Sequence, residues 1–466
     1  MGMTLIAEPQ YFTPAYNPCK FIYNSTNKNN EGFRYIFDVY EQGTANKVGE
    51  YRVLPTFGTG YGEVDLSKLL GAKVTPDFQP FNFTESDTPN SRFNYDVKVG
   101  EEYIVTFNYT ANLTNNSGNV KITCTHNFSV GDQVVFNAGT NTLISGLWTV
   151  IAVTGTTDFT INAAWSNVSD PTENGSVKYA DNRKTIVRDI EVTLDKWVFN
   201  GALPWSSWNG YSFYNYLLNG PYSLFLTSCP TSEMTITRYQ ELWFNGFNAG
   251  VNGKMIFINS NGDVFKYDVT NTEITTQLCV ASPSLSLDLL SGTYPLVKAD
   301  TTYYDVYFID ASVPTDSRTY RFNIDQRCAI NDYHLVFLDR MGSWGSFAFP
   351  LRSYETGTST KQSFNKVVQG YVQSEQWTYD SFERGMTTYS STVEKNLQLN
   401  TNWMSEEMAV YFQELITSPV VYFWDGSQYL ACIVQETSFE VERQRNKNLI
   451  KKTVNVKLAN QDKVNI

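Results

Sequence analysis

Met341-Gly-Ser-Trp-Gly-Ser-Phe-Ala-Phe349 and Val420-Val-Tyr-Phe-Trp424 are two aromatic stretches that frame the part of the chain on which the fold depends. Aromatic and β-branched residues of this kind are typical of strands. Between them, apolar residues recur with the spacing of one helix face; they are Met404, Met408, Tyr411, Phe412 and Leu415. We therefore expect one helix between strands.

This helix, near Met404–Thr417, has recognisable ends. Ser405 is a plausible N-cap and is followed by two acids in the first turn, where the helix dipole favours them. Pro419 prevents the helix from continuing. We expect the helix to cover one face of a sheet, which makes residues 334–466 an α+β domain. The expected strands of that sheet are residues 420–423, 429–439 and 452–458, with an Asp425-Gly426 turn after the first.

This order of elements resembles the C-terminal module of tail and baseplate-hub or neck-ring proteins of tailed bacteriophages, especially crAss-like and Bacteroides-type phages. The resemblance covers residues 341–466, roughly a quarter of the chain. It implies a structural virion protein of the phage tail, assembled in the cytoplasm of the bacterial host. Its partners would be copies of itself in a ring or hub, other tail or neck proteins, and tail fibres.

Composition places the whole chain in the mainly β class. The 466 residues are too many for one ordinary core, so several domains are expected. Aromatic residues make up 15% and charged residues 18%, and the net charge is −12. An acidic surface disfavours specific nucleic-acid binding and anionic membranes. The sequence has no signal-peptide pattern and no apolar run long enough to span a membrane.

The N-terminal part alternates as a half-buried strand does. Phe33, Tyr35, Phe37 and Val39 share one face, and Tyr103, Val105, Phe107 and Tyr109 share another. The same alternation returns at Ile190, Val192 and Leu194. We expect a β-sandwich that comprises residues 1–117 and 181–222.

Residues 118–180 interrupt this pattern with a block of short strands. Its Val130-Gly131-Asp132 turn resembles the entry of small SH3-like barrels, which also occur as inserts in phage tail proteins. We expect a small β-barrel inserted at an exposed loop, where insertions are tolerated.

A second β domain is expected over residues 223–333. Asn261-Gly262 between apolar runs is a strong hairpin signal. A second hairpin is expected where two alternating stretches flank a loop with Pro314 and Asp316; these are Tyr304, Val306, Phe308 and Tyr320, Phe322, Ile324.

Residues that carry chemistry are few, and we expect no catalytic, cofactor or metal site. None of the six cysteines falls in C-x-x-C spacing, and only His126 and His334 could supply imidazoles. Gly58-Thr-Gly-Tyr-Gly62 lacks the Lys-Ser/Thr of a phosphate loop and is expected to form a turn. No pair of acids stands out by spacing as a glycosidase pair.

The candidate assembly contacts are basic and aromatic residues: Arg443, Arg445, Lys447, Trp424, Trp205 and Trp208. The three cations either form a solvated hairpin tip, contact an acidic neighbour or contact phosphate. Trp205 and Trp208 lie in an aromatic segment, residues 197–222. That segment could pack loops together, anchor a subunit contact or stack on sugars.

Two other functions stay open. A glycan-binding protein that recognises the host surface would use exposed Trp, Tyr and Asn residues. A virion depolymerase would need an acidic pair in a cleft with aromatic walls.

Overall fold

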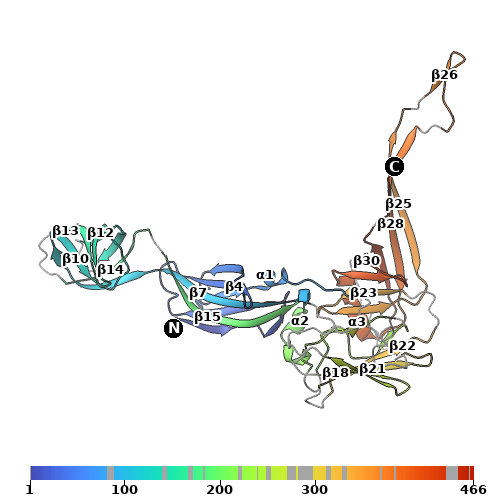
Figure 1. Ribbon diagram of the computed structural model, residues 1–466, viewed down its shortest axis with the longest axis horizontal. Coiled ribbons are helices and arrows are strands. Elements are labelled where there is room, and N and C mark those ends of the chain that lie inside the picture. Colours follow the sequence, from blue (N-terminus) through green and yellow to red (C-terminus); the bar gives the residue numbers. More distant parts are fainter. Residues whose placement is uncertain are drawn as a thin grey trace. The chain divides into compact units, whose positions relative to one another are not determined.

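The computed structural model shows a mainly β, multidomain protein, as expected from the sequence (Figure 1). It divides into two compact units. The first comprises Met1–Tyr11, Pro18–Leu69 and Asn94–Lys196, and the second comprises Phe12–Asn17, Leu70–Phe93 and Trp197–Ile466. The structure describes residues 2–80, 89–138, 144–165, 172–181, 184–218, 223–238, 240–247, 253–269, 280–281, 297–310, 316–327, 333–367, 370–382, 385–436, 450–460 and 462–465.

The first unit contains a β-sandwich. One sheet has the order β1 (Met3–Ala7), β3 (Lys20–Ser25), β6 (Gly62–Asp65). The other places β15 (Lys184–Phe199), β7 (Arg92–Ile104), β4 (Arg34–Glu41) and β5 (Lys47–Val53) side by side. The last residues of β15 belong to the second unit, where they pair with the short β2 (Phe12–Pro14).

Aromatic side chains fill the space between the two sheets. Tyr23 meets Phe37 edge-on, with ring centroids 5.9 Å apart, and Phe21 meets Tyr95 in the same way at 6.4 Å. All four side chains are fully buried. The expected face made by Phe33, Tyr35, Phe37 and Val39 is also buried, which confirms that prediction.

The glycine-rich stretch before β6 is a turn, as expected. Gly58 and Gly60 have φ of 89° and 70°, a region that favours glycine. The Tyr35 hydroxyl donates to the Gly60 carbonyl at 2.9 Å. A Cβ on Gly62 would lie 2.3 Å from the Tyr35 ring, so this position also requires glycine.

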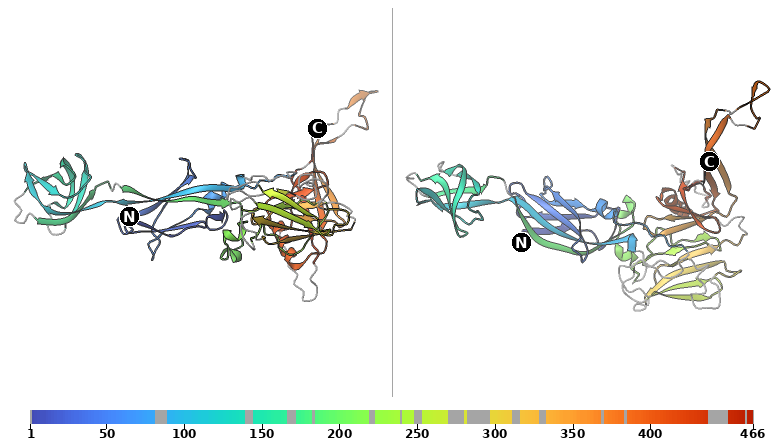
Figure 2. Two further views of the ribbon diagram at one scale, coloured as in Figure 1. Left: turned by 60° about the horizontal axis from the view of Figure 1, so that its bottom comes forward. Right: turned by 45° about the horizontal axis from the view of Figure 1, so that its top comes forward.

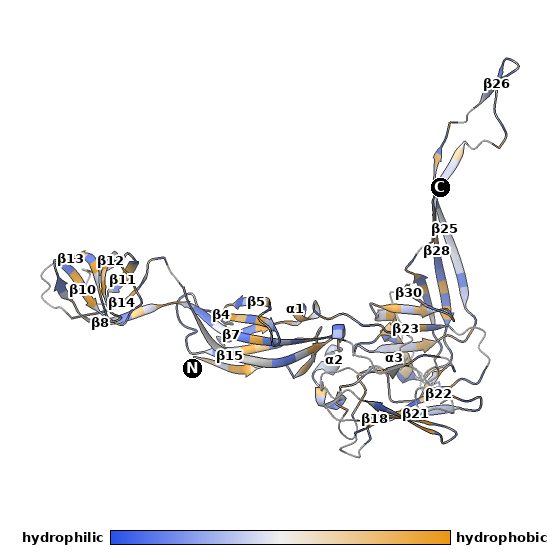
Figure 3. Ribbon diagram, viewed as in Figure 1, coloured by the Kyte–Doolittle hydropathy of each residue, from blue (hydrophilic) through white to orange (hydrophobic). Residues whose placement is uncertain are grey.

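A curled seven-stranded sheet forms a second part of the first unit, with hydrophobic and hydrophilic residues interspersed along its strands (Figure 3). Phe128, Phe136 and Phe159 pack in its core. The Asp132 carboxylate accepts from the Ser129 N–H at 2.7 Å, and Gly131 has φ of 96°, so the expected turn is present. In sheet order the strands are β8 (Thr106–Asn112), β14 (Thr172–Tyr179), β11 (Gln133–Ala138), β12 (Gly146–Thr154), β13 (Asp158–Ala164), β10 (Asn119–Thr123) and β9 (Thr114–Asn116).

The alternation from Tyr103 to Tyr109 does not form one strand of the sandwich, contrary to expectation. β7 ends at Ile104 in the sandwich, and β8 begins at Thr106 in the seven-stranded sheet. Two consecutive strands can continue the same alternation while they belong to different sheets, so a two-residue period does not locate this boundary. The strands of the small sheet therefore start before residue 118, the expected start of the insert.

The second unit contains a five-stranded sheet with both predicted hairpins. In sheet order the strands are β16 (Met234–Ile236), β22 (Tyr320–Ile324), β21 (Tyr303–Asp310), β18 (Gly253–Asn259) and β19 (Val264–Val269). Gly262 has φ of 85° at the turn between β18 and β19, and Tyr304 lies opposite Phe322 in the antiparallel pair of β21 and β22. A separate pair joins β17 (Trp243–Phe244) to β20 (Val280–Ala281).

The last sheet of this unit carries the helix predicted from the sequence, α3 (Glu406–Thr417). The Ser405 hydroxyl accepts from the Met408 N–H at 3.2 Å, so the expected cap is present. Met404 lies outside the helix and forms a bridge with Ile450. The strand order is β24 (Trp344–Ala348), β23 (His334–Leu338), β29 (Val421–Trp424), β30 (Tyr429–Val434), β31 (Thr453–Leu458), β28 (Met386–Asn400) and β25 (Tyr354–Asn365), and β32 (Asp462–Asn465) also pairs with β28.

The buried face of α3 contacts this sheet, as expected. Phe412 lies 5.1 Å from Phe347 between ring centroids, and Tyr411 lies 5.3 Å from Phe337. The same cluster of buried side chains also includes Phe322 and Met255 of the five-stranded sheet. Residues on both sides of the expected domain boundary at 333–334 thus share one core, and the expected domain limits themselves stay a prediction.

The opposite face of the sheet is covered by a strap, residues 72–80, which follows α1 (Ser67–Gly71). The Phe78 ring stacks on Tyr422 with centroids 4.2 Å apart and lies 4.7 Å from Trp344. The Trp344 indole N–H donates to the Asp77 carbonyl at 2.7 Å. The described part of this unit also contains the short helices η1 (Pro89–Ser91), α2 (Trp205–Trp208) and η3 (Phe213–Tyr216).

The position of β7 beside β15 generates a prediction. Because these strands are neighbours in one sheet, the chain that leaves at Ile104 returns at Lys184 close by. Replacement of residues 106–181 by a short Gly/Ser linker is therefore expected to leave the sandwich folded, since loop closure costs little when the ends are near. Thermal unfolding followed by near-UV circular dichroism should show one cooperative transition for the sandwich aromatics, and its loss would contradict the prediction.

Candidate functional site

The second unit has a long, exposed β-hairpin, which we call the arm: β25, β28 and the chain between them, residues 354–400. The strands pair antiparallel from Tyr354 opposite Gln398 to Asn365 opposite Met386. Beyond them, β26 (Tyr371–Gln373) and β27 (Gln376–Thr378) pair with each other near the tip. Figure 2 shows the arm leaving the C-terminal sheet in both views.

Apolar side chains are concentrated on the arm. All twelve residues of β25 are exposed. Among the described residues, 23 large hydrophobic side chains are exposed, and ten of them lie in the arm, so the arm differs from the rest of the surface. They are Tyr354, Phe364, Val367, Tyr371, Val372, Trp377, Tyr379, Phe382, Met386 and Tyr389.

The aromatic side chains near the tip are held in place by the backbone around them. A Cβ on Gly370 would lie 2.2 Å from the Trp377 indole, so the ring lies directly on this glycine. Tyr379 lies beside Trp377, with ring centroids 5.5 Å apart. A two-stranded hairpin is marginally stable in water by itself, and concentrated exposed apolar surface marks sites of association. The arm is therefore suited to bind another molecule.

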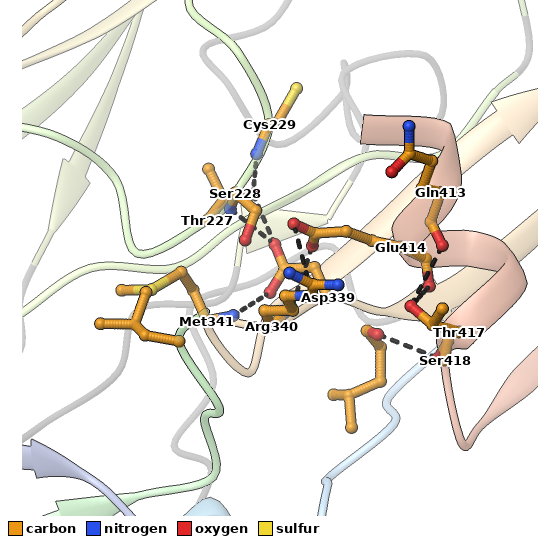
Figure 4. Close-up of polar contacts among 12 residues, drawn as sticks. Thr227, Ser228, Cys229, Asp339, Arg340, Met341, Gln413, Glu414, Thr417 and Ser418 are labelled. Carbon is orange, nitrogen blue, oxygen red and sulfur yellow. Dashed lines mark hydrogen bonds and ion pairs between the residues drawn. The ribbon is translucent and has the colours of Figure 1, made fainter. Parts of the chain in front are cut away.

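A second unusual feature is a buried carboxylate, Asp339, whose side chain is enclosed by hydrogen-bond donors (Figure 4). One oxygen accepts from the Thr227 hydroxyl at 2.7 Å and the Ser228 N–H at 2.9 Å. The other accepts from the N–H groups of Met341 and Ser343, both at 2.9 Å. Asp339 thus ties the segment at 227–228 to the turn that leads into β24.

Glu414 of α3 is the acidic neighbour of this carboxylate. Its side chain accepts from the Arg340 N–H at 3.1 Å (Figure 4). Burial, followed by the charge of Glu414, raises the pKa of Asp339 to about 7, and burial also raises the pKa of Glu414. The hydrogen bonds from Ser228, Thr227 and Ser343 favour the ionised form of Asp339 and act against this rise.

Both acids line a cavity of about 620 Å³, so a catalytic role has to be weighed. Tyr16 is the one aromatic residue among the described residues that line this cavity. A glycosidase needs two carboxylates that face the substrate. All four acceptor positions of the Asp339 carboxylate are used by protein donors. These hydrogen bonds hold the turn together and leave no acceptor position for a substrate. The arrangement is that of a structural polar cluster.

A second cavity, of about 800 Å³, lies beside the first turn of α3. Its walls include Trp403, whose side chain is exposed, and Phe347. Glu233, Asn323 and Asn402 supply polar groups to it. Aromatic surface next to amide and carboxylate groups is a lining that could bind a sugar.

The residues predicted as assembly contacts lie in three places. Trp205 is exposed in α2, while Trp208 is half-buried there and stacks on Tyr211 at 5.7 Å between centroids. Trp424 is half-buried on β29 and lies 4.8 Å from the Tyr429 ring. The cations at 443, 445 and 447 lie outside the described residues. The arm was not among the candidates; its signal in the sequence is a long polar stretch with high strand propensity and no proline from residue 351 to 418.

Within the ranges that the structure describes, no group of three or more His, Cys, Asp or Glu side chains could hold a metal ion. Over the same ranges, no helix is long and apolar enough to cross a membrane.

Comparisons with known proteins give little guidance. No family model matches the chain, and no curated protein matches its sequence. Among solved structures, it is similar to the phage phi92 endosialidase, with 11% identity over 98% of this chain and 68% of that chain and a TM-score of 0.16. It is also similar to Bacteroides ovatus SGBP-B of a mixed-linkage glucan utilization locus, with 8% identity over 73% of each chain and a TM-score of 0.13. Dimeric latent PorU from Porphyromonas gingivalis has 8% identity over 70% of this chain and 34% of that chain, with a TM-score of 0.13. Superpositions with such scores do not establish a shared fold.

Asp339 provides a test of the structural interpretation of the buried cluster. In Asp339→Asn, an amide NH₂ would face donors where an oxygen accepted two hydrogen bonds, so we expect the free energy of unfolding to fall by about 2–4 kcal/mol. Asp425→Asn makes the same chemical change in the turn between β29 and β30, where Asn is well tolerated, and should alter stability by less than about 0.5 kcal/mol. Urea denaturation of both variants measures the difference. Equal stability of the two variants would show that the Asp339 network is not a structural requirement.

Proposed function

We propose that this protein is a structural component of a phage virion tail, a tail hub or an adjacent ring or neck protein, that assembles with itself and with other virion proteins. The first support is the resemblance of residues 341–466 to the C-terminal module of such proteins. The expected order of strand, capped helix and strand pair occurs in the fold as β24, α3, β29 and β30. The resemblance supports the role in the virion, and the exposed apolar surface of the arm supports the role in assembly.

The arm is the observation that supports assembly most directly. It holds ten exposed large apolar side chains on a hairpin whose outer strand is exposed along its whole length. A chain that keeps such a surface in water is expected to cover it in a complex. Trp205, exposed on α2, is a further candidate for a subunit contact.

We also propose that the role is not enzymatic. The two acids with raised pKa values belong to a cluster in which Asp339 is occupied by four protein donors, and Glu414 accepts from the backbone N–H of Arg340. No cofactor is part of this proposal. The partners we propose are copies of this chain and neighbouring tail or neck proteins, with tail fibres as further candidates.

A second function, glycan binding at the host surface, is favoured by the cavity beside α3. Trp403 would supply a stacking surface, and Asn402, Asn323 and Glu233 would supply hydrogen-bonding groups. Binding of host glycans that is lost in Trp403→Ala, by a protein that stays monomeric, would favour this function over assembly.

The assembly function predicts closed rings of the purified full-length chain in native mass spectrometry and negative-stain electron microscopy. Because each copy has a net charge of −12, local positive charge at a contact between copies reduces their repulsion. Reversal of Arg443, Arg445 and Lys447 to Glu should therefore shift the chain toward monomers, most strongly at low salt, where charge pairs are least screened.

The control variant is K20E/K68E/K73E, which makes the same change in net charge at three exposed lysines of other elements. It should assemble as the natural chain does. If both triple variants assemble equally well, the cations at 443–447 form a solvated tip and not a contact. A natural chain that stays monomeric at all concentrations and salt levels would contradict self-assembly itself.

A further inference from the structure

We propose that the free edge of β25 is a pairing edge, on which a strand of a neighbouring copy of this chain adds to the C-terminal sheet and continues it across the subunit boundary. This inference rests on the proposed self-assembly and names the contact that would produce it. The bonds would be main-chain hydrogen bonds, as in β-strand addition to an exposed sheet edge.

The first observation is the position of β25 in its sheet. It is the last strand, and among the described residues its ladder partner is β28 alone. A strand with one partner directs every second N–H and C=O away from that partner. Over twelve exposed residues this leaves a long row of donors and acceptors that a second strand could use.

The second observation is that β25 has few of the features that keep an edge unpaired. Edges are usually protected by proline, by several charges, by bulges or by shortness. β25 has no proline and two charged residues, Glu355 and Lys361. Its one irregularity, between Gln362 and Ser363, leaves the nine residues before it in regular pairing. Five of its residues are Ser or Thr, which suit a solvent-exposed strand that can also pair.

The third observation concerns charge and favours a second copy as the occupant. Residues 354–400 contain five acidic and four basic residues, so the arm is nearly neutral in a chain of net charge −12. Two copies therefore repel each other less along their arms than over their surfaces in general. Exposed apolar side chains at both ends of β25, Tyr354 and Phe364, would be covered by the same contact. Phe364 lies beside Tyr389 of β28, with centroids 6.2 Å apart.

Hydrogen exchange of the natural full-length chain tests the contact directly. In the monomer, one alternate set of β25 amides is paired with β28 and the other set exchanges freely. In the assembly, pairing on the free edge should slow exchange of the second set by about tenfold or more. Exchange followed by fragmentation mass spectrometry resolves the two sets. Assemblies in which the second set exchanges as fast as in the monomer would overturn this inference while the proposed function stands.

Two neighbouring proline variants, Ser359→Pro and Thr360→Pro, give an independent test. Adjacent residues of a strand direct their N–H groups to opposite sides, so one variant removes an outward donor and the other breaks the ladder with β28. We expect the variant that removes an outward donor to fold as a monomer that no longer assembles. If both variants assemble as the natural chain does, the inference is wrong. If neither variant folds, the hydrogen exchange of the natural chain decides alone.

A truncation separates the edge from the aromatic tip. Ser363 and Thr388 are directly paired, so residues 364–387 can be replaced by Asn-Gly as a two-residue hairpin turn. This variant lacks Trp377 and Tyr379 but keeps most of the edge, and it should still assemble with protected β25 amides. Loss of assembly in this variant, together with unprotected β25 amides in the natural assembly, would show that the tip makes the contact. Protection of β25 that requires another protein or a glycan, with no self-assembly, would overturn both this inference and the proposed self-assembly.

Discussion

Leu335 and Phe337 of β23 point into one cluster of buried side chains, and Val336 and Leu338 point into another on the opposite face. A strand buried on both faces requires a covering layer on each side, because every side chain along it must leave water. In the second unit, α3 and the five-stranded sheet cover one face, and the strap with Phe78 covers the other. These layers come from segments far apart in the sequence, so the double burial of β23 holds together most of the unit.

This constraint also explains why Asp339 can be buried. It follows β23 directly, and the turn from Asp339 to Ser343 leads the chain into β24. The carboxylate satisfies the N–H groups of that turn and the segment at Thr227, which would otherwise be buried without partners. A raised pKa in a buried acid is often a sign of catalysis. Here the geometry gives the acid a structural task, and the raised pKa is a consequence of burial.

Local patterns in the sequence were sufficient to predict the elements that have a recognisable turn, cap or periodicity. The Asn261-Gly262 hairpin, the capped helix ending before Pro419 and the buried face of β4 follow from turn chemistry, capping and periodicity. The arm could not be predicted in this way. Its tip turn uses Ser374 and Glu375, both at positive φ, in place of Asn-Gly, and its polar strands have no alternation that would indicate a buried face. Phe78 was also missed, because its partners Tyr422 and Trp344 are long-range contacts that no local window contains.

The insertion of the small seven-stranded sheet between β7 and β15 has a consequence for the order in which the chain is made. β7 leaves the ribosome before the small sheet, and its neighbour β15 follows only after residues 105–183 have been synthesised. At about 5–20 residues per second this interval lasts roughly 4–16 s. During that time one edge of β7 lacks its final neighbour, and by the end of it all the strands of the small sheet have been made. A compact insert that folds within this interval would shorten the distance between the two strands and help the nascent sandwich to close.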